Sequence, residues 1–382
     1  MSSWLALFGF LKKEMEKKKI LVIDNSAISV DENGFYINAF NGEFVRELQQ
    51  IGNKVSYLQF KAENKSELSS FNLKTVGIDV VLMKLYRNKL LRYFIAYIRL
   101  FFIILRYDFV YFYYPSSFKY ATFFCKLFGK PYGLYIRGMY GVAYDRLSTA
   151  IYKNAKAILT VSEAFNKEIN KVVGEEKAKS IRPMIPLSSE DIVYDRVYSN
   201  DKKEFTLLYF ARVAKEKGVE ELLKAFKRVS EFYSIRLVFV GNGEFFEQTK
   251  VLVKELDLEQ RVSLEGICTD EQLKRNYFLN ADMYILPTYH EGFPRTLYEA
   301  MIFGTPIITT FVGGIPALMK DKYNCIRIEP KSEESIVEGL EYAINNYEEM
   351  IRYAKNGFDT VSKIVDVNRL SHAEMLNEII RK

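Results

Sequence analysis

The stretch "MYILPTYHEGFPRTLYEAMIFGTPIITT", residues 283–310, predicts a strand, a turn, a helix and a second strand. Its two ends are short β-rich runs, 283–288 and 306–310, and Pro294 suits the first position of the helix between them. Gly292 permits a tight backbone path in the turn. A strand, a helix and a strand in this order form the building unit of a parallel sheet covered by helices.

The same alternation extends along the chain in both directions. We predict an α/β protein with two doubly wound, Rossmann-like domains, 1–200 and 201–361, because the polar stretch "SNDKKE" (199–204) separates two series of strands. A C-terminal helix at about 362–382 is expected to pack back on the first domain. Ligands of such sheets gather at the carboxyl ends of the strands, so we expect the site in the cleft between the domains. The expected strands are 19–24, 54–59, 108–114, 132–137 and 155–161 in the first domain, and 205–211, 235–241, 261–267, 283–288, 306–310 and 325–330 in the second.

The composition indicates a globular protein. With 382 residues, of which 49% are hydrophobic and 27% charged, the chain can form two cores. Three cysteines without a Cys-x-x-Cys pair, and only two histidines, give poor support for disulfides or zinc, so a reducing cytoplasm is expected. At the start of the chain an apolar run precedes the lysines and no small-residue cleavage site follows, which is the reverse of a secretory signal.

Basic and aromatic side chains are concentrated in residues 84–137. This window holds ten Lys or Arg against one acid, Asp108, together with nineteen Phe or Tyr. The first domain is therefore predicted to meet an anionic surface.

Two carboxylates, Glu291 and Glu299, lie on either side of the first turn of the helix predicted from residue 294. Free amides at a helix start favour an anion. A phosphate bound there would have a carboxylate on each side, able to accept hydrogen bonds from hydroxyls of a sugar or a ribose. This layout predicts a nucleotide sugar as the ligand.

A diphosphate also needs cations. Arg212 follows the first strand of the second domain, and Lys217 precedes the next helix. The segments "VGNGE" (240–244) and "FVGGIP" (311–316) add glycine turns after strands, where the backbone can approach a phosphate or a base closely.

Together, these segments resemble the donor-binding domain of the retaining GT-B glycosyltransferases of family GT4, glycosyl transferases group 1. The matching segments, in family order within residues 201–345, are "FARVAKEKG", "VGNGE", "LPTYHEGFPRTLYEAMIFGTPII" with its Glu-x7-Glu spacing, and "VGGIP". In the first domain "RYDFVYFYYP" and "NAKAILTVSEAFNKEI" extend the resemblance more loosely.

The resemblance implies the GT-B fold and a metal-independent transferase without a cofactor, whose donor substrate is a nucleotide-diphosphate sugar; no nucleic-acid partner is expected. Arg212 and Lys217 would bind the diphosphate and stabilise its charge as the sugar leaves, with Glu291 on the donor sugar and Glu299 on the ribose. The chain contains no Asp-x-Asp. The further donor-binding candidates are Gly292, Phe293, Pro294, Thr296, Leu297, Gly241 and Arg137.

The first domain departs from the family pattern. Family members often show two adjacent glycines after the first strand and a histidine in the acceptor half, whereas "NGFYINAFNGEF" has single glycines and "YIRGMYG" has no histidine. Arg137 and Gly138 in the latter could face either the acceptor or the donor phosphate. Neither the acceptor nor the base and sugar of the donor can be read from single residues.

Ordinary structural roles compete with these interpretations. The two glutamates also fit a solvated loop acid and a helix acid favoured by the helix dipole, and Arg212 and Lys217 fit surface charges. His290 fits a positioning residue better than a base, since retention can proceed through front-side attack without a protein base.

The segment "NKLLRYFIAYIRLFFIILRYDF" (88–109) predicts an apolar helix with Arg92, Arg99 and Arg106 along one stripe. Charge interrupts it too often for it to span a bilayer. It is either a fully packed helix of the fold, or a helix whose core side faces the sheet while its basic, aromatic flanks rest on anionic lipid. Residues 1–13 fit a short amphipathic foot or a disordered tail equally well.

Three functions remain open at this point. The leading hypothesis is a transferase that acts on a lipid-linked glycan in surface polysaccharide synthesis, peripheral on the inner face of the cell membrane. The second keeps the chemistry with a soluble acceptor. The third is a catalytically silent, membrane-associated subunit of a glycan assembly complex, against which the intact Arg212, Lys217, Glu291 and Glu299 argue.

Overall fold

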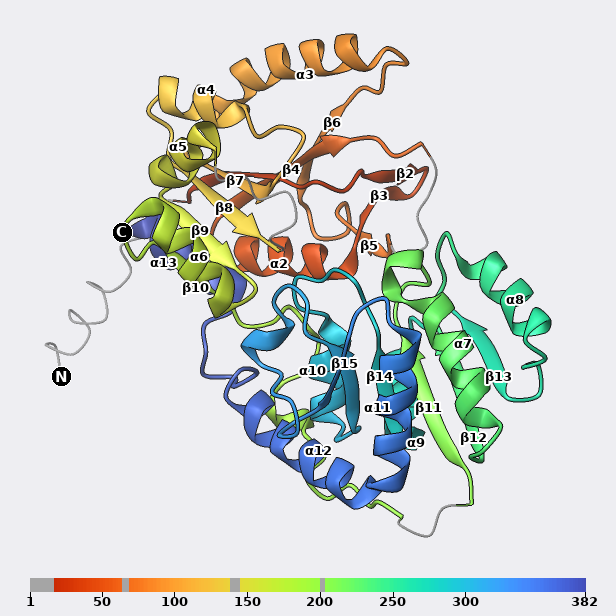
Figure 1. Ribbon diagram of the computed structural model, residues 1–382. Coiled ribbons are helices and arrows are strands. Elements are labelled where there is room, and N and C mark those ends of the chain that lie inside the picture. The colour runs from red at the N-terminus through yellow and green to blue at the C-terminus, as the bar shows by residue number, and fades with distance from the viewer. Residues whose placement is uncertain (1–16, 64–68, 138–144, 200–202) are drawn as a thin grey trace, which may run out of the picture.

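The computed structural model describes residues 17–63, 69–137, 145–199 and 203–382, which form two α/β domains (Figure 1). Each domain is built on a parallel sheet with helices on both faces, so the predicted α/β class with two doubly wound sheets is confirmed. The predicted boundary at residue 200, the segment 1–13 and Gly138 lie outside the described residues.

The first sheet has seven strands in the order β10-β9-β8-β7-β1-β4-β6, and every neighbouring pair is parallel. The chain adds β4 and β6 on one side of β1 and then β7 to β10 on the other, so the topological switch point lies between β1 and β7. β7, "FVYFYY", is buried along its whole length, as expected for a central parallel strand. The strands are β1 (Lys19–Ile23), β4 (Lys54–Phe60), β6 (Asp79–Met83), β7 (Phe109–Tyr114), β8 (Tyr132–Ile136), β9 (Ala157–Thr160) and β10 (Ala178–Ser180).

Helices cover this sheet, and a small antiparallel sheet lies beside it. The helices are α2 (Ala39–Gln50), α3 (Lys89–Ile104), α4 (Ala121–Leu127), α5 (Arg146–Asn154) and α6 (Glu163–Val173), and the small sheet consists of β2 (Ser29–Asp31), β3 (Gly34–Ile37) and β5 (Phe71–Asn72).

The second sheet has six parallel strands in the order β13-β12-β11-β14-β15-β16. Its switch point lies between β11 and β14, whose carboxyl ends lead to Arg212 and to Glu291. The elements are β11 (Phe205–Phe210), α7 (Val219–Ser230), β12 (Ile235–Val240), α8 (Phe246–Glu255), β13 (Val262–Gly266), α9 (Glu271–Asn280), β14 (Met283–Leu286), α10 (Arg295–Ile302), β15 (Ile307–Thr310), β16 (Ile326–Ile328), α11 (Glu333–Asn345) and α12 (Tyr347–Ser362).

The last helix, α13 (His372–Arg381), returns to the first domain and packs on α2 and β9. Ala373, Leu376 and Ile380 bury their side chains in the first domain's core. His372 lies 2.7 Å from the Tyr111 hydroxyl through Nε2, and burial lowers the pKa of its imidazole to about 3. The chain thus crosses between the domains twice, at 182–186 and again before α13. The first crossing precedes the predicted boundary at residue 200, because Val193 already donates to the Ile302 carbonyl of α10 at 2.9 Å.

α3 is not the fully packed helix of the first expectation, and as in the second expectation only one side of it faces the core. Ala96, Leu100 and Ile104 are buried, but the opposite face of the helix is solvent-exposed and apolar. Arg92 donates from Nε to the Tyr86 carbonyl at 2.9 Å, and Arg99 from Nη1 to a carbonyl of β6 at 3.2 Å. The helix is therefore not fully packed, and two of its arginines hydrogen-bond to the protein's own backbone. Its exposed large apolar side chains are Leu90 (84%), Leu91 (47%), Phe94 (65%), Ile98 (47%) and Phe102 (59%), followed by Leu105 (45%) just past its end.

Within the described residues, no helix is long and apolar enough to cross a bilayer. The same part of the chain contains no cluster of three or more His, Cys, Asp or Glu side chains arranged to hold a metal ion.

Candidate functional site

The predicted helix start is present, one residue later than expected. Pro294 is the N-cap of α10, whose first helical residue is Arg295, and no side chain caps this end of the helix. Phe293 is buried and packs its ring against Tyr298, with centroids 4.5 Å apart. Thr296 accepts a hydrogen bond from the Tyr284 hydroxyl at 2.6 Å. The amide groups at the start of α10 thus have no capping side chain.

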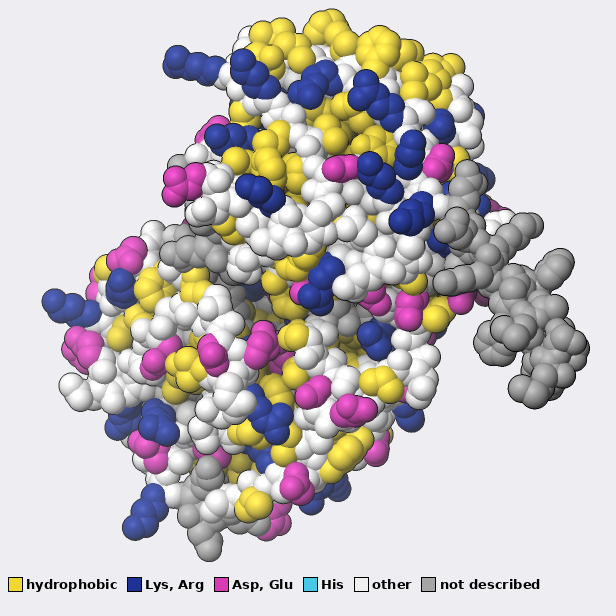
Figure 2. Space-filling view, turned by 180° about the vertical axis from the view of Figure 1, so that it is seen from behind, with side chains coloured by type: hydrophobic (Ala, Val, Ile, Leu, Met, Phe, Trp, Pro, Cys, Tyr) yellow, Lys and Arg dark blue, Asp and Glu magenta, His cyan; other side chains and the backbone are white. Residues whose placement is uncertain are grey.

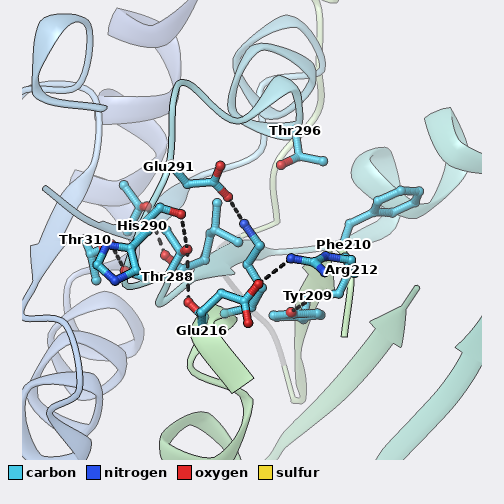
Figure 3. Close-up of polar contacts among 12 residues, drawn as sticks. Tyr209, Phe210, Arg212, Glu216, Thr288, His290, Glu291, Thr296 and Thr310 are labelled. Atoms are coloured by element: carbon cyan, nitrogen blue, oxygen red, sulfur yellow. Dashed lines mark hydrogen bonds and ion pairs between the residues drawn. The ribbon is translucent and has the colours of Figure 1, made fainter. Parts of the chain in front are cut away.

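Lys217 and Glu291 form an ion pair beside this helix start (Figure 3). Their side chains are only 13% and 17% exposed, so the pair is shielded from solvent more than most surface pairs are. Lys217 ends a single 3-10 turn, η2 (Lys215–Lys217), after β11, and Glu291 comes from the loop after β14. Neighbouring strands at the switch point therefore bring together two residues that are 74 positions apart.

Backbone contacts hold the loop of Glu291 against η2. The Glu216 carbonyl accepts from the Tyr289 amide at 2.8 Å and from the Thr288 hydroxyl at 3.3 Å. Thr310 donates in turn to the Thr288 carbonyl at 2.7 Å. Figure 3 shows Thr288 between Glu216 and Thr310, below Glu291. One main-chain bond and two threonine hydroxyl bonds thus hold the segment just before Glu291 against η2 and β15.

Arg212 is more open, with a side chain 51% exposed. Its guanidinium pairs with Glu216 through Nη2 and with Glu244 through Nη1, the latter at 3.2 Å. Because exposed ion pairs contribute little stability, an incoming anion can replace these carboxylates at low cost.

Two glycine turns bring loops into contact here. A Cβ at Gly241 would stand 1.9 Å from the Ala211 carbonyl oxygen, and its φ of +144° disfavours any other residue. A Cβ at Gly313 would stand 1.8 Å from the carbonyl oxygen of Glu291. Gly292 accepts from the Gly314 amide at 2.8 Å. These glycines therefore have a packing reason of their own, whether or not a ligand touches them.

Glu299, which is predicted to accept hydrogen bonds from the ribose, already has a partner within the protein. It is buried in α10, and its Oε1 accepts from Lys274 Nζ of α9 at 2.8 Å. Burial raises the pKa of the Glu299 carboxyl, although Lys274 acts in the opposite direction. Burial alone would lower the pKa of Lys274, but Glu299 and Glu271 outweigh it and raise this pKa. Glu299 keeps one carboxylate oxygen, Oε2, with acceptor capacity for a hydroxyl.

Sequence reasoning missed Lys274. It lies in "DEQLKRNYF", where a lysine three residues after Glu271 looks like an ordinary surface pair. Only the packing of α9 against β11 reveals that its side chain is 9% exposed and reaches Glu299.

A cavity of about 490 Å³ lies between the domains. It is lined by α2, by the first crossing segment, by Ser371 and His372 at the second crossing, and by Glu271 at the start of α9. Lys217, Glu291 and Glu299 are not part of its wall, but Glu271 in the wall pairs with Lys274, the partner of Glu299. Its volume falls in the range typical of small-molecule sites.

Arg137 comes from the first domain and does not join the Lys217–Glu291 group in the contacts described. It donates from Nη2 to Asn25 Oδ1 at 2.7 Å and lies over the ring of Tyr113, 5.3 Å from its centroid. Arg295 of α10 is, after Lys274, the second cation that sequence reasoning missed. Its guanidinium lies 3.6 Å from the ring centroid of Phe40 in the first domain.

Residues 192–360 match the family model described as "Glycosyl transferases group 1". The expected resemblance to these glycosyltransferases is therefore confirmed. The match begins after the first crossing segment and ends in α12, so it includes Arg212, Lys217, Lys274, Glu291 and Glu299.

Curated relatives carry the same class of name. The chain is 29% identical over 241 residues to the uncharacterized glycosyltransferase MJ1607 of Methanocaldococcus jannaschii, covering 58% of this chain and 60% of that one. It is 28% identical to the putative teichuronic acid biosynthesis glycosyltransferase TuaC of Bacillus subtilis, over 57% of this chain and 55% of that one. The chain thus matches a little over half of the length of these two relatives.

Solved structures confirm the predicted GT-B fold. The apo form of the lipopolysaccharide outer core galactosyltransferase WaaB superposes with a TM-score of 0.70 at 20% identity, covering 95% of this chain and 99% of that one. Anabaena HepE in complex with UDP superposes with a TM-score of 0.65 at 18% identity, covering 95% of this chain and 98% of that one.

Proposed function

We propose that this protein is a retaining, metal-independent glycosyltransferase that moves a sugar from a nucleotide-diphosphate sugar to an acceptor. The observation that carries the proposal is the gathering of Lys217, Arg212 and Glu291 at the uncapped amide end of α10, at the switch point of the second sheet. Support comes from the family match over this region and from HepE, a protein of the same fold that was solved with UDP.

In this proposal the diphosphate binds at the amide end of α10. Lys217 and Arg212 exchange their carboxylate partners for phosphate oxygens and stabilise the charge that develops as the sugar leaves. Glu291, released from Lys217, accepts hydrogen bonds from hydroxyls of the sugar, and Glu299 Oε2 from those of the ribose. Gly292, Phe293, Pro294, Thr296 and Leu297 form the turn and the helix start that hold the ligand, and Gly241 brings the neighbouring loop close.

No protein base is required in this scheme. The acceptor hydroxyl attacks the anomeric carbon on the face that the diphosphate leaves, the bond from that carbon to the diphosphate oxygen breaks, and the proton of the hydroxyl passes to that oxygen. The cations supply the electrostatic stabilisation that a metal ion supplies elsewhere. The chain's part is to hold both groups in place and to neutralise charge.

A panel of nucleotide sugars tests this function. Thermal stabilisation of the full chain by one of them, followed by release of the free nucleotide when acceptors are added, is the expected result. A panel in which no nucleotide sugar stabilises the protein would contradict the donor site. Stabilisation without any release, over a broad set of acceptors, would favour a silent subunit.

We further propose that the acceptor is a lipid-linked glycan of surface polysaccharide synthesis and that the protein works on the inner face of the cell membrane. The support is the exposed apolar face of α3, which we call the α3 ridge: Leu90, Leu91, Phe94, Ile98, Phe102 and Leu105. In Figure 2 hydrophobic side chains gather along the top of the molecule, with Lys and Arg below them. α3 lies in the first domain, on the side away from the second domain (Figure 1).

The charges around the α3 ridge favour lipid as its partner. Lys84, Arg87, Lys89, Arg106, Lys119 and Lys126 belong to the same basic window, whose single acid, Asp108, accepts from the Lys19 amide. Burying apolar surface contributes about 25 cal/mol per Å², and each basic group near an anionic surface adds about 1 kcal/mol. The α3 ridge would then lie among the acyl chains, with the cations at the headgroups. High salt alone would not release a protein bound at this depth.

Vesicle sedimentation tests this part. The protein is expected to sediment with vesicles of anionic lipid and to remain bound in high salt, but to be released by detergent. Complete release by salt would contradict insertion of the α3 ridge, and no binding at low salt would favour a soluble acceptor.

A further inference from the structure

Polar groups of the first domain converge where β1, β7 and β8 end. Asn25 follows β1, Tyr113 lies at the end of β7 and Arg137 follows β8. The topological switch point of the first sheet falls between β1 and β7. Crevices at this position are where doubly wound sheets bind ligands. The second domain contributes one group from the opposite side, Arg295 of α10.

Arg295 has no carboxylate at ion-pair distance among the described residues. Its guanidinium stacks on Phe40 of the first domain, and Glu299, the acid nearest along α10, pairs with Lys274 instead. Burial lowers the pKa of Arg295, Tyr135 opposes this, and the neighbouring positive charge of Arg137 lowers it further. Two guanidinium groups thus lie near each other in a partly dry site without a carboxylate in contact among the described residues, and the more distant charge of Glu299 opposes only part of the cost to Arg295.

Arg137 is held in this place by neutral contacts. Asn25 accepts its hydrogen bond and the ring of Tyr113 lies beneath it. Asp24, the acid next to Asn25, does not balance the arginines by contact, since it already accepts from Tyr57 and, at 2.8 Å, from Asn41.

Tyr113 supplies an independent observation. Its side chain is 0% exposed, and its hydroxyl has no hydrogen-bond partner among the described residues. Burial raises the pKa of this phenol, so the hydroxyl keeps its proton as a donor. A buried donor without an acceptor is rare in native proteins and favours a partner from outside the chain, a ligand group or an ordered water.

We propose that Arg137, Arg295 and Tyr113 form an anion subsite that binds an acidic group of the acceptor, a phosphate ester or a sugar carboxylate. The assignment to the acceptor rests on the proposed function, because the cations for the donor diphosphate, Arg212 and Lys217, belong to the second domain's own switch point. Arginine suits this task, since its planar fork binds carboxylate and phosphate oxygens bidentately. Binding would also draw the domains together, because the two guanidiniums come from opposite sides.

The test uses the full chain saturated with UDP and two small probes, methyl phosphate and glucuronate, titrated by NMR. We expect at least one probe to bind with a millimolar dissociation constant. Arg295→Met and Arg137→Met each weaken it about tenfold or more, and Tyr113→Phe about two- to fivefold. The control, Arg352→Met, removes an arginine that stacks over an aromatic ring of α12, outside the cleft, and is expected to change nothing. Preference for methyl phosphate assigns the group to a phosphate, and preference for glucuronate to a carboxylate.

UDP affinity separates this subsite from the donor site. In Arg295→Met and in the charge-preserving Arg295→Lys, UDP affinity should stay within about threefold of the unaltered protein while anion binding falls most in the former. A loss of UDP affinity as large as the loss of probe affinity would place the arginines on the donor diphosphate and overturn the subsite. Failure of both probes to bind would overturn it as well. If UDP itself does not bind, the titration of the unliganded protein still decides the subsite, so the two proposals fail separately.

Discussion

The two sides of the cleft differ in how their charges are balanced. On the donor side, at the switch point of the second sheet, each candidate cation has an acid: Lys217 pairs with Glu291, Arg212 with Glu216 and Glu244, and Lys274 with Glu299 and Glu271. On the first domain's side, Arg137 is held by an amide and a ring, and the arginine that faces it, Arg295, by a ring alone.

The two sides therefore require different groups from a ligand. The donor side, which we call the paired side, has its charges balanced without a ligand. A dianionic ligand can replace the carboxylates on the cations, and its own hydroxyls can then donate to those carboxylates. The unpaired side gains a partner only when an anion arrives. We infer that the donor side is preorganised and that the acceptor side is completed by its substrate.

The largest expected effect concerns the buried pair on the paired side. Lys274→Met leaves Glu299 buried without its cation and should lower the free energy of unfolding by about 3–5 kcal/mol. Lys250→Met, which removes an exposed partner of Glu247 in α8, is the matched control and should change it by less than about 0.5 kcal/mol. Urea unfolding at neutral pH measures both, and equal stability of the two variants would contradict the pairing.

The second effect concerns turnover. Lys217→Ala and Glu291→Ala should each lower kcat by about 100-fold or more, because both groups are aligned with the leaving diphosphate and its sugar. Lys215→Ala removes an exposed charge from the same turn and should leave kcat unchanged. Single-turnover assays on folded variants provide the measurement. Full activity of Lys217→Ala would reduce the pair to a structural contact.

Most candidate residues of the paired side could be predicted from the sequence. The Glu-x7-Glu spacing, the proline at the helix start and the glycine turns predicted where Arg212, Lys217, Glu291 and Glu299 would gather. What it could not give was the partner of each charge, because Lys274 reaches Glu299 through the packing of α9, and nothing in a nine-residue window reveals that contact.

The unpaired side was harder to predict. Arg295 lies within the stretch 283–310, but an arginine in the first turn of a helix is common. Only the structure shows that Phe40 and Tyr113 of the first domain lie near it. The α3 segment shows the same limit. Its apolar positions surround the helix, so periodicity alone does not say which face lacks a partner.

The third effect concerns the α3 ridge. Phe94→Glu and Phe102→Glu should each lower binding to anionic vesicles by about tenfold or more, since a charge must enter the apolar layer. Phe232→Glu is the matched control, because Phe232 is 81% exposed but follows α7 in the second domain. Arg99→Glu is expected to affect folding of the first domain more than membrane binding, as its side chain bonds to β6. Equal binding of all four variants would contradict insertion of the α3 ridge.

The smallest effect is a dependence of stability on pH. His372 is held neutral by burial, with a pKa of about 3 in the folded state against an ordinary value of about 6.5. The unfolded chain therefore binds a proton that the folded chain does not, and stability falls as pH drops below about 6.5, by about 1.4 kcal/mol at pH 5.5. Urea unfolding of the protein and of His372→Gln at pH 7.5 and 5.5 measures it. A loss of the same size in His372→Gln would assign the pH dependence to other groups.

Calorimetry with UDP, GDP and ADP in the presence of EDTA tests whether the site of Arg212, Lys217 and Glu291 binds a diphosphate without a metal. We expect that at least one of the three binds, that adding a divalent ion changes the affinity little, and that Lys217→Ala weakens the binding while Arg352→Met does not. Binding by none of them, or binding only when a divalent ion is restored, would contradict a metal-free diphosphate site.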